Sequence, residues 1–134
     1  MYTPSNITDP SGIHKELETM QAFLEANYNS DNPASVQERF DELAIYMARS
    51  GKLKADGEWH YNSLVESTII SALKKAYEKE LGTSTLNKYV ESVAKDYKFL
   101  VSWAERVNRS CVHQLDAMRS IISTLRAERF HNRA

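Results

Sequence analysis

Residues 86–125 read LNKYVESVAKDYKFLVSWAERVNRSCVHQLDAMRSIISTL and carry the longest regular hydrophobic pattern of the chain. Apolar and aromatic residues recur there at alternating steps of four and three, and neither proline nor glycine interrupts them. We call this stripe the seam; its positions are Leu86, Val90, Val93, Tyr97, Leu100, Ala104, Val107, Cys111, Gln114, Met118, Ile121 and Leu125. Such spacing aligns side chains along one helix, as in coiled coils. It predicts a single helix over residues 84–128, roughly 65–70 Å long.

The sequence just before the seam indicates a tight turn. Gly82 follows Leu81 as a typical helix end, and Thr83 and Ser84 offer caps for the next helix. Helical spacing also runs from about residue 33 to 50 and from about 58 to 81. Gly51 and Gly57 lie between these stretches, and each costs a helix about 1 kcal/mol relative to alanine. The sequence is therefore compatible with a bend, a break or a continuous helix between Gly51 and Gly57.

A further helix is predicted over about residues 13–28, after a flexible N-terminal arm of residues 1–12 that contains Pro4, Pro10 and Gly12. The turn at Gly82 folds the long helix back on the stretch before it. The predicted fold is therefore all-α: a long antiparallel helical hairpin with an additional N-terminal helix packed across it. Residues 13–130 would form one helical domain, and residues 131–134 a C-terminal tail.

Composition excludes several classes of protein. The chain has 134 residues, 42% of them hydrophobic and 26% charged, which is typical of one globular domain rather than a disordered chain. A net charge of −1 gives no overall attraction to nucleic acid or to an anionic membrane. The lone Cys111 indicates a reducing compartment, and neither a signal peptide nor a membrane-spanning run is recognisable. We expect a cytoplasmic protein without a membrane partner.

One candidate site lies where the predicted hairpin would bring polar residues together. Folding about Gly82–Thr83 places Gln114, the polar member of the seam, opposite Ser50 and Gly51. We therefore predict that Gln114 contacts the segment 50–54. We call the surrounding set the polar waist; its residues are Ser50, Lys52, Lys54, Trp59, His60, Arg106, Arg109, His113 and Gln114. The alternatives are that Gln114 only fixes helix register and that the arginines form a solvated outer face.

A second candidate site is a row of arginines near the C-terminus. Residues 1–45 carry eight acidic residues against two basic ones, whereas residues 101–134 carry six arginines against three acidic residues. Four of the arginines follow helical spacing, namely Arg119, Arg126, Arg129 and Arg133. This stripe could contact nucleic-acid phosphates or another anion. Alternatively, it balances the acidic end of the chain and complements the helix dipole.

The sequence predicts no catalytic residue, no metal site and no cofactor. Zinc-finger and HExxH spacings are absent, as are GxGxxG, phosphate-loop and GxSxG motifs. Cys111 lies within the apolar seam, where a packed thiol is more common than a nucleophile. A small helical enzyme centred on residues 50–62 and 103–114 remains as a weaker alternative.

Two segments, Met47–Asp56 (MARSGKLKAD) and Trp103–Asp116 (WAERVNRSCVHQLD), resemble small helical proteins of unassigned function from phages and prophages of gut bacteria. The likeness covers roughly residues 45–125 and transfers no catalytic residue. It implies a mobile-element origin, an action in the bacterial host cytoplasm, and a role in DNA replication, recombination, packaging or counter-defence.

Together these observations predict a non-enzymatic interaction module rather than an enzyme. Wide apolar stripes on long helices leave more surface than 134 residues readily cover, which favours a homodimer. An unidentified protein partner, within phage DNA metabolism or host interaction, is compatible with this reading. Direct nucleic-acid binding by the arginine stripe is the main alternative.

Overall fold

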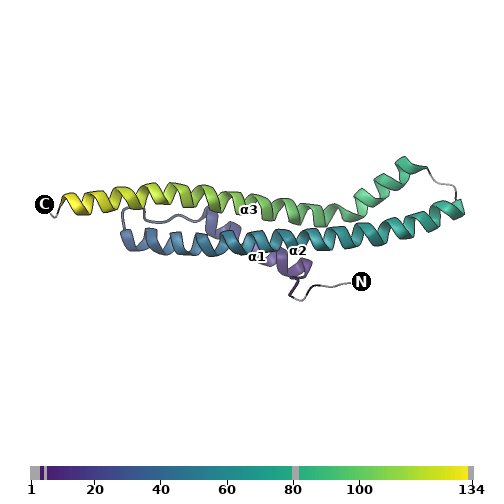
Figure 1. The fold of residues 1–134 in the computed structure, drawn as a ribbon, viewed down its shortest axis with the longest axis horizontal. Helices are drawn as coiled ribbons and strands as arrows, with labels where there is room; N and C mark the ends of the chain where they lie inside the picture. The colour runs from purple at the N-terminus through teal and green to yellow at the C-terminus, as the bar shows by residue number, and fades with distance from the viewer. Residues whose placement is uncertain (1–3, 5, 80–81, 133–134) are drawn as a thin grey trace.

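The computed structural model describes residues 4, 6–79 and 82–132, and every regular element among them is an α-helix. Helix α1 spans Pro10–Glu25, α2 spans Pro33–Lys79 and α3 spans Thr83–His131. Helices α2 and α3 lie side by side as a long hairpin, and α1 packs across part of it (Figure 1). The predicted all-α hairpin with an additional N-terminal helix is confirmed.

Both long helices are continuous. Helix α3 runs unbroken through the predicted range 84–128, and α2 continues through Gly51 and Gly57. The role of Gly57 follows from its surroundings, because this residue is buried at the point where α3 crosses α2. A β-carbon added there would lie 3.1 Å from Cγ2 of Val101, and one added at Gly51 would lie 3.8 Å from Nδ2 of Asn108. Gly57 therefore permits a close approach of two helices and does not break α2.

Helix α1 begins earlier than its apolar stripe suggests. Asp9 caps it by accepting a hydrogen bond from the Gly12 amide at 2.7 Å, and Pro10 occupies the first turn, where no amide donor is needed. The predicted boundaries at residues 13 and 28 therefore shift to Pro10 and Glu25. Within the segment expected to be a flexible arm, residues 10–12 are helical and Thr8 is hydrogen-bonded to α2.

The hydrophobic core lies only where all three helices meet. Its most buried side chains are Ile13, Leu17 and Met20 of α1, Val36, Leu43 and Leu53 of α2, and Leu100, Ala104, Val107, Cys111, Leu115 and Met118 of α3. Seam positions in this part of α3 are buried as predicted, apart from the half-buried Gln114. The start of the seam is less buried than predicted, because Leu86 and Val90 are half-buried and Val93 is 38% exposed.

At the end where α2 turns back into α3, the hairpin has only two helices. We call it the hairpin tip and define it as residues 62–79 and 82–95. Helix α1 begins at Pro10, beside Asp96 and Tyr97, and does not extend over the tip, where the first turns of α3 lean away from α2 (Figure 1). Few tip side chains are buried, among them Thr68, Ala72 and Ala94. A pair of helices has no third surface to cover its apolar flanks, so these flanks face solvent.

Candidate functional site

A buried carboxylate fastens the N-terminal segment to α2. Asp56 is 1% exposed, accepts a hydrogen bond from the Thr8 amide at 3.0 Å and pairs with the ammonium of Lys52. Nε2 of His60 lies 2.7 Å from the Thr8 carbonyl oxygen. Burial alone would raise the pKa of Asp56, but the hydrogen bonds from Lys52 and Thr8 outweigh it and hold that pKa below its usual value. These contacts position residues 6–8.

A second ion pair joins α1 to α2 directly. Arg49 donates from Nε and Nη2 to the two carboxylate oxygens of Glu16, both at 2.8 Å, and Nη2 also reaches Thr8 Oγ1 at 3.0 Å. The hydrogen bond from Arg49 lowers the pKa of Glu16. The geometry is the bidentate fork that favours arginine over lysine. Like the Asp56 cluster, it fixes the first helix on the hairpin.

The structure divides the polar waist among three different surroundings. Lys52 and His60 belong to the Asp56 cluster, with the Trp59 ring packed edge-on against His60 at 5.2 Å. Ser50 is fully buried and accepts a hydrogen bond from Nδ2 of Asn108 at 3.2 Å. The other members are paired locally or exposed: Lys54 with Glu58 at 3.8 Å, Arg109 with Glu105 at 2.8 Å, and Arg106 and His113 on the outer face. They do not converge on one ligand position.

The predicted contact of Gln114 with residues 50–54 is wrong. Asn108, almost two helical turns earlier in α3, occupies that level and also donates to the Met47 carbonyl at 2.8 Å. The prediction assumed that both helices start at the same level. Figure 1 shows instead that α2 extends past the first residue of α3, so α3 residues pair with earlier turns of α2. Gln114 consequently faces Arg39.

Arg39 is the polar centre that sequence reasoning missed. Its side chain is 6% exposed, and its Nη2 donates to Gln114 Oε1 at 2.8 Å. The same nitrogen lies 3.2 Å and 3.3 Å from the carbonyl oxygens of Phe23 and Leu24, at the end of α1. Gln114 completes the cluster by donating from Nε2 to the Leu24 carbonyl at 3.1 Å. This latch joins all three helices.

Aromatic rings enclose the guanidinium of Arg39. Its central carbon lies 4.5 Å from the Phe23 ring centroid and 4.6 Å from that of Tyr28, both in cation–π range. Beside it is a cavity of about 400 Å³, lined by Leu24, Glu25, Ala26, Asn27, Tyr28, Arg39, Gln114 and Ala117. The available sequence signal was that Arg39 lies at helical spacing between Val36 and Leu43, on the buried face of α2.

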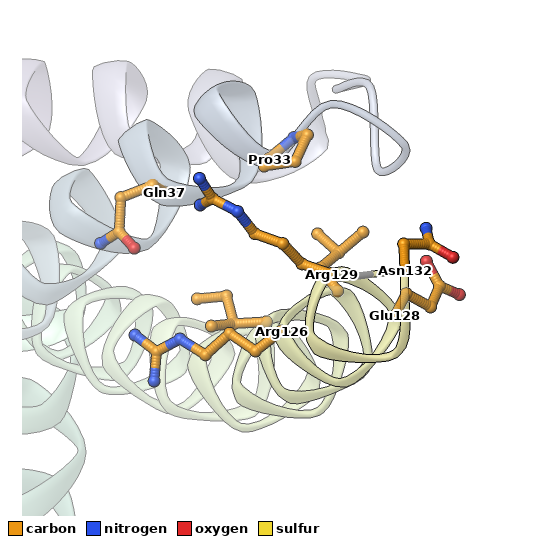
Figure 2. Close-up of a pocket in the computed structure, with 8 residues that line it drawn as sticks. Pro33, Gln37, Arg126, Glu128, Arg129 and Asn132 are labelled. Carbon is orange, nitrogen blue, oxygen red and sulfur yellow. The ribbon is translucent and has the colours of Figure 1, made fainter. Parts of the chain in front are cut away.

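A larger groove, about 570 Å³, separates the start of α2 from the end of α3. Arg126 and Arg129 of α3 line it, and Figure 2 shows Arg129 extending toward the first turns of α2, between Gln37 and Pro33, whereas Arg126 extends along α3. Of the predicted arginine stripe, Arg119 instead pairs with Asp116 at 2.8 Å, and Arg133 lies outside the described residues. The structure thus brings two of the four arginines to one groove.

The start of α2 adds no anion site to this groove. Pro33 has no amide hydrogen, and Asn32 Oδ1 already accepts from the amides of Ala34 at 3.0 Å and Ser35 at 3.4 Å. The Val36 amide bonds to the Asn32 carbonyl at 3.1 Å. Because the first-turn donors are occupied, only the two arginines could hold an anion here.

Within the described ranges, no group of three or more His, Cys, Asp or Glu side chains could hold a metal ion. Cys111 is fully buried, and burial raises the pKa of its thiol, which disfavours the nucleophilic thiolate. No described helix is both long and apolar enough to cross a membrane.

Compared with known protein families, curated proteins and solved structures, the chain matches none of them.

Proposed function

We propose that this chain is a non-enzymatic helical interaction module that self-associates through its hairpin tip. The observation that carries this proposal is an exposed apolar stripe on α2, formed by Ile69, Ile70, Leu73 and Tyr77. These four residues fall within an arc of about 100° on one helix. Leu73 is 58% exposed and Tyr77 is 92% exposed, so the stripe faces solvent.

On α3 of the tip, Tyr89 and Val93 are 46% and 38% exposed, but Tyr89 lies beside Lys75, on the other flank of α2 from this stripe. The exposed apolar surface of the four α2 side chains amounts to roughly 450 Å², somewhat over half of what one partner buries in a standard interface. A contiguous apolar patch of this size is comparable to the largest patch of a typical single-chain protein, which is often an interaction site. Farther along the hairpin, α1 covers one apolar flank with Ile13, Leu17 and Met20. The tip has no such cover within the described residues.

A second copy of the tip is the partner that fits this patch best. Residues 62–95 carry five lysines and four glutamates, so two tips in contact would repel each other little. Two hairpins joined about a two-fold axis form a four-helix bundle, in which each patch covers the other. A cavity of about 200 Å³ between the helices, lined by Ala72, Lys75, Thr85, Leu86 and Tyr89, could receive an apolar side chain of the second copy.

Sedimentation velocity over a concentration series tests this proposal, with Leu73→Glu and Tyr77→Glu combined as the disruptive variant. We expect the native chain to dimerise and the variant to dissociate at least tenfold more readily. Ile45→Glu is the matched control, because Ile45 is 65% exposed on α2 but lies outside the tip. Circular dichroism would verify that each variant is helical. A monomeric native chain, or equal weakening by Ile45→Glu, would refute self-association through the tip.

A second candidate function is nucleic-acid binding in phage or prophage DNA metabolism. Its support is that Arg126 and Arg129 share the C-terminal groove and have no ion-pair partner among the residues described. Binding of a labelled DNA duplex at two salt concentrations tests it. Removing both arginines should reduce the salt slope by about two units, whereas Arg109→Ala, on the outer face, should leave it unchanged. An unchanged slope in the double variant would exclude this groove.

A further inference from the structure

We propose that the cavity beside Arg39 is a binding site for a single carboxylate group. The site lies at the opposite end of α1 from the Asp56 cluster and does not involve the hairpin tip. Its central cation, the Arg39 guanidinium, is more than nine-tenths buried. The Arg39 side chain lines the cavity. The proposal is independent of self-association.

Arg39 lacks a charged partner within the described chain. A buried arginine is normally paired with a carboxylate, because removing a full charge from water is costly. Arg39 makes no ion pair with any described residue, although Arg49 on the same helix has Glu16. Its acceptors are two backbone carbonyls and the amide oxygen of Gln114, all uncharged. The protein thus holds a positive charge that it only partly compensates.

Some hydrogen-bond donors of Arg39 and Gln114 remain without an acceptor. All three hydrogen bonds of the guanidinium use Nη2. Nε is buried without a partner, whereas Nη1 has no partner in the described chain and keeps contact with solvent. Nε2 of Gln114, also at the cavity, uses one of its two hydrogens on Leu24. Nη1 and Gln114 could therefore donate together to the two oxygens of one carboxylate.

Negative charge around the cavity disfavours a divalent anion more than a monovalent one. The cavity lies at the C-terminal end of α1, where the helix dipole is negative, and Glu25 is on its rim. Glu25 is exposed, and its carboxylate accepts a hydrogen bond from Gln21 at 3.0 Å. A phosphate dianion would be repelled by both features more strongly than a carboxylate.

Nuclear magnetic resonance tests the proposal on the full chain. Sodium acetate is titrated at constant ionic strength while the side-chain N–H signals of Arg39 and Gln114 are followed. We expect saturable shifts of both signals with a Kd of roughly millimolar, as a single charge-assisted contact allows. Acetamide, of similar shape but neutral, should give no saturable shift, and phosphate should bind at least tenfold more weakly. Glu25→Gln should tighten acetate binding.

Ala117→Phe is the blocking variant, because Ala117 lines the cavity on exposed α3 surface and takes no part in the latch. It should abolish the shifts while leaving the helical circular dichroism unchanged. Asn27→Trp closes the same cavity from the loop, should Ala117→Phe fail to fold. Absence of saturable shifts with acetate, or unchanged binding in a folded blocking variant, would show that Arg39 is a structural latch only.

A further experiment distinguishes two sources of the carboxylate, a small free carboxylate and the C-terminus of a polypeptide. A short peptide with a free C-terminal carboxylate is compared with acetate and with the same peptide amidated at its C-terminus. Peptide binding at least tenfold tighter than acetate, lost on amidation, would identify a polypeptide end as the ligand. Equal binding of acetate and peptide would identify a free small carboxylate. Binding that survives amidation would overturn carboxylate recognition.

Discussion

Replacing Gly57 by valine should destabilise the protein, because α3 leaves no room for a side chain at this point of α2. A β-carbon at residue 57 would lie 3.1 Å from Cγ2 of Val101 and 3.8 Å from its backbone nitrogen and Cα. Val101 is β-branched and stiff in a helix, so it cannot easily rotate away. Overpacking of this kind costs about 1–3 kcal/mol.

Gly51 is the matched control on the same helix. It is exposed, and a β-carbon there would meet Asn108 Nδ2 at an ordinary 3.8 Å. Gly51→Ala should therefore stabilise the protein by about 0.5–1 kcal/mol through helix propensity alone. Gly57→Ala gains the same propensity but must displace Val101, so we expect little or no net stabilisation.

Urea unfolding followed by circular dichroism at 222 nm would measure these differences, with the Gly51 and Gly57 variants compared pairwise. The slope of free energy against urea should stay constant if the variants change stability and not compactness. A stabilising effect of Gly57→Ala equal to that of Gly51→Ala would refute the close approach of α3. Tolerance of Gly57→Val would refute it more strongly still.

Three further predictions follow from the described contacts. Leu100→Ala in the core should cost about 2–5 kcal/mol and Arg109→Ala on the outer face less than about 0.5, and comparable losses in urea unfolding would contradict the assigned faces. The lowered pKa of Asp56 means that its stabilising contribution is present above the unfolded pKa of about 3.9 and is lost as the pH falls through the lower folded value. Asp56→Asn should remove that part of the acid dependence, and an unchanged pH profile of unfolding would contradict it. Gln114→Leu should cost about 1–3 kcal/mol, since Arg39 loses its side-chain acceptor; a stabilised variant in thermal unfolding would show that the latch is dispensable.

Helix content could be predicted from the sequence because it depends on local spacing. The seam alone indicated α3, and the Gly82 turn made the hairpin follow. The outer face was also predictable, and Arg106, Arg109 and His113 are exposed as expected. Such features need only a helical period of 3.6 residues and the preference of apolar side chains for burial.

The level at which the helices pair could not be predicted in the same way. Gln114 and Ser50 each lie on an inward face, but their partners are Arg39 and Asn108, because α2 extends beyond the start of α3. An offset between two helices leaves the periodicity of each unchanged, so the pattern cannot report it. The spacing of Arg39 between Val36 and Leu43 indicated its buried face, but its pairing with Gln114 depended on this offset.

The sequence by itself determined which residues are helical, where the chain turns back and which face of α3 is apolar. Tertiary structure decided how much of that face is buried, because α1 covers the middle of the hairpin and stops short of its tip. The same stripe therefore holds the buried Leu100 and the exposed Val93. The physical reason is that periodicity orients a side chain about its helix axis, whereas burial requires a neighbour, and only the packed fold shows where the neighbours end.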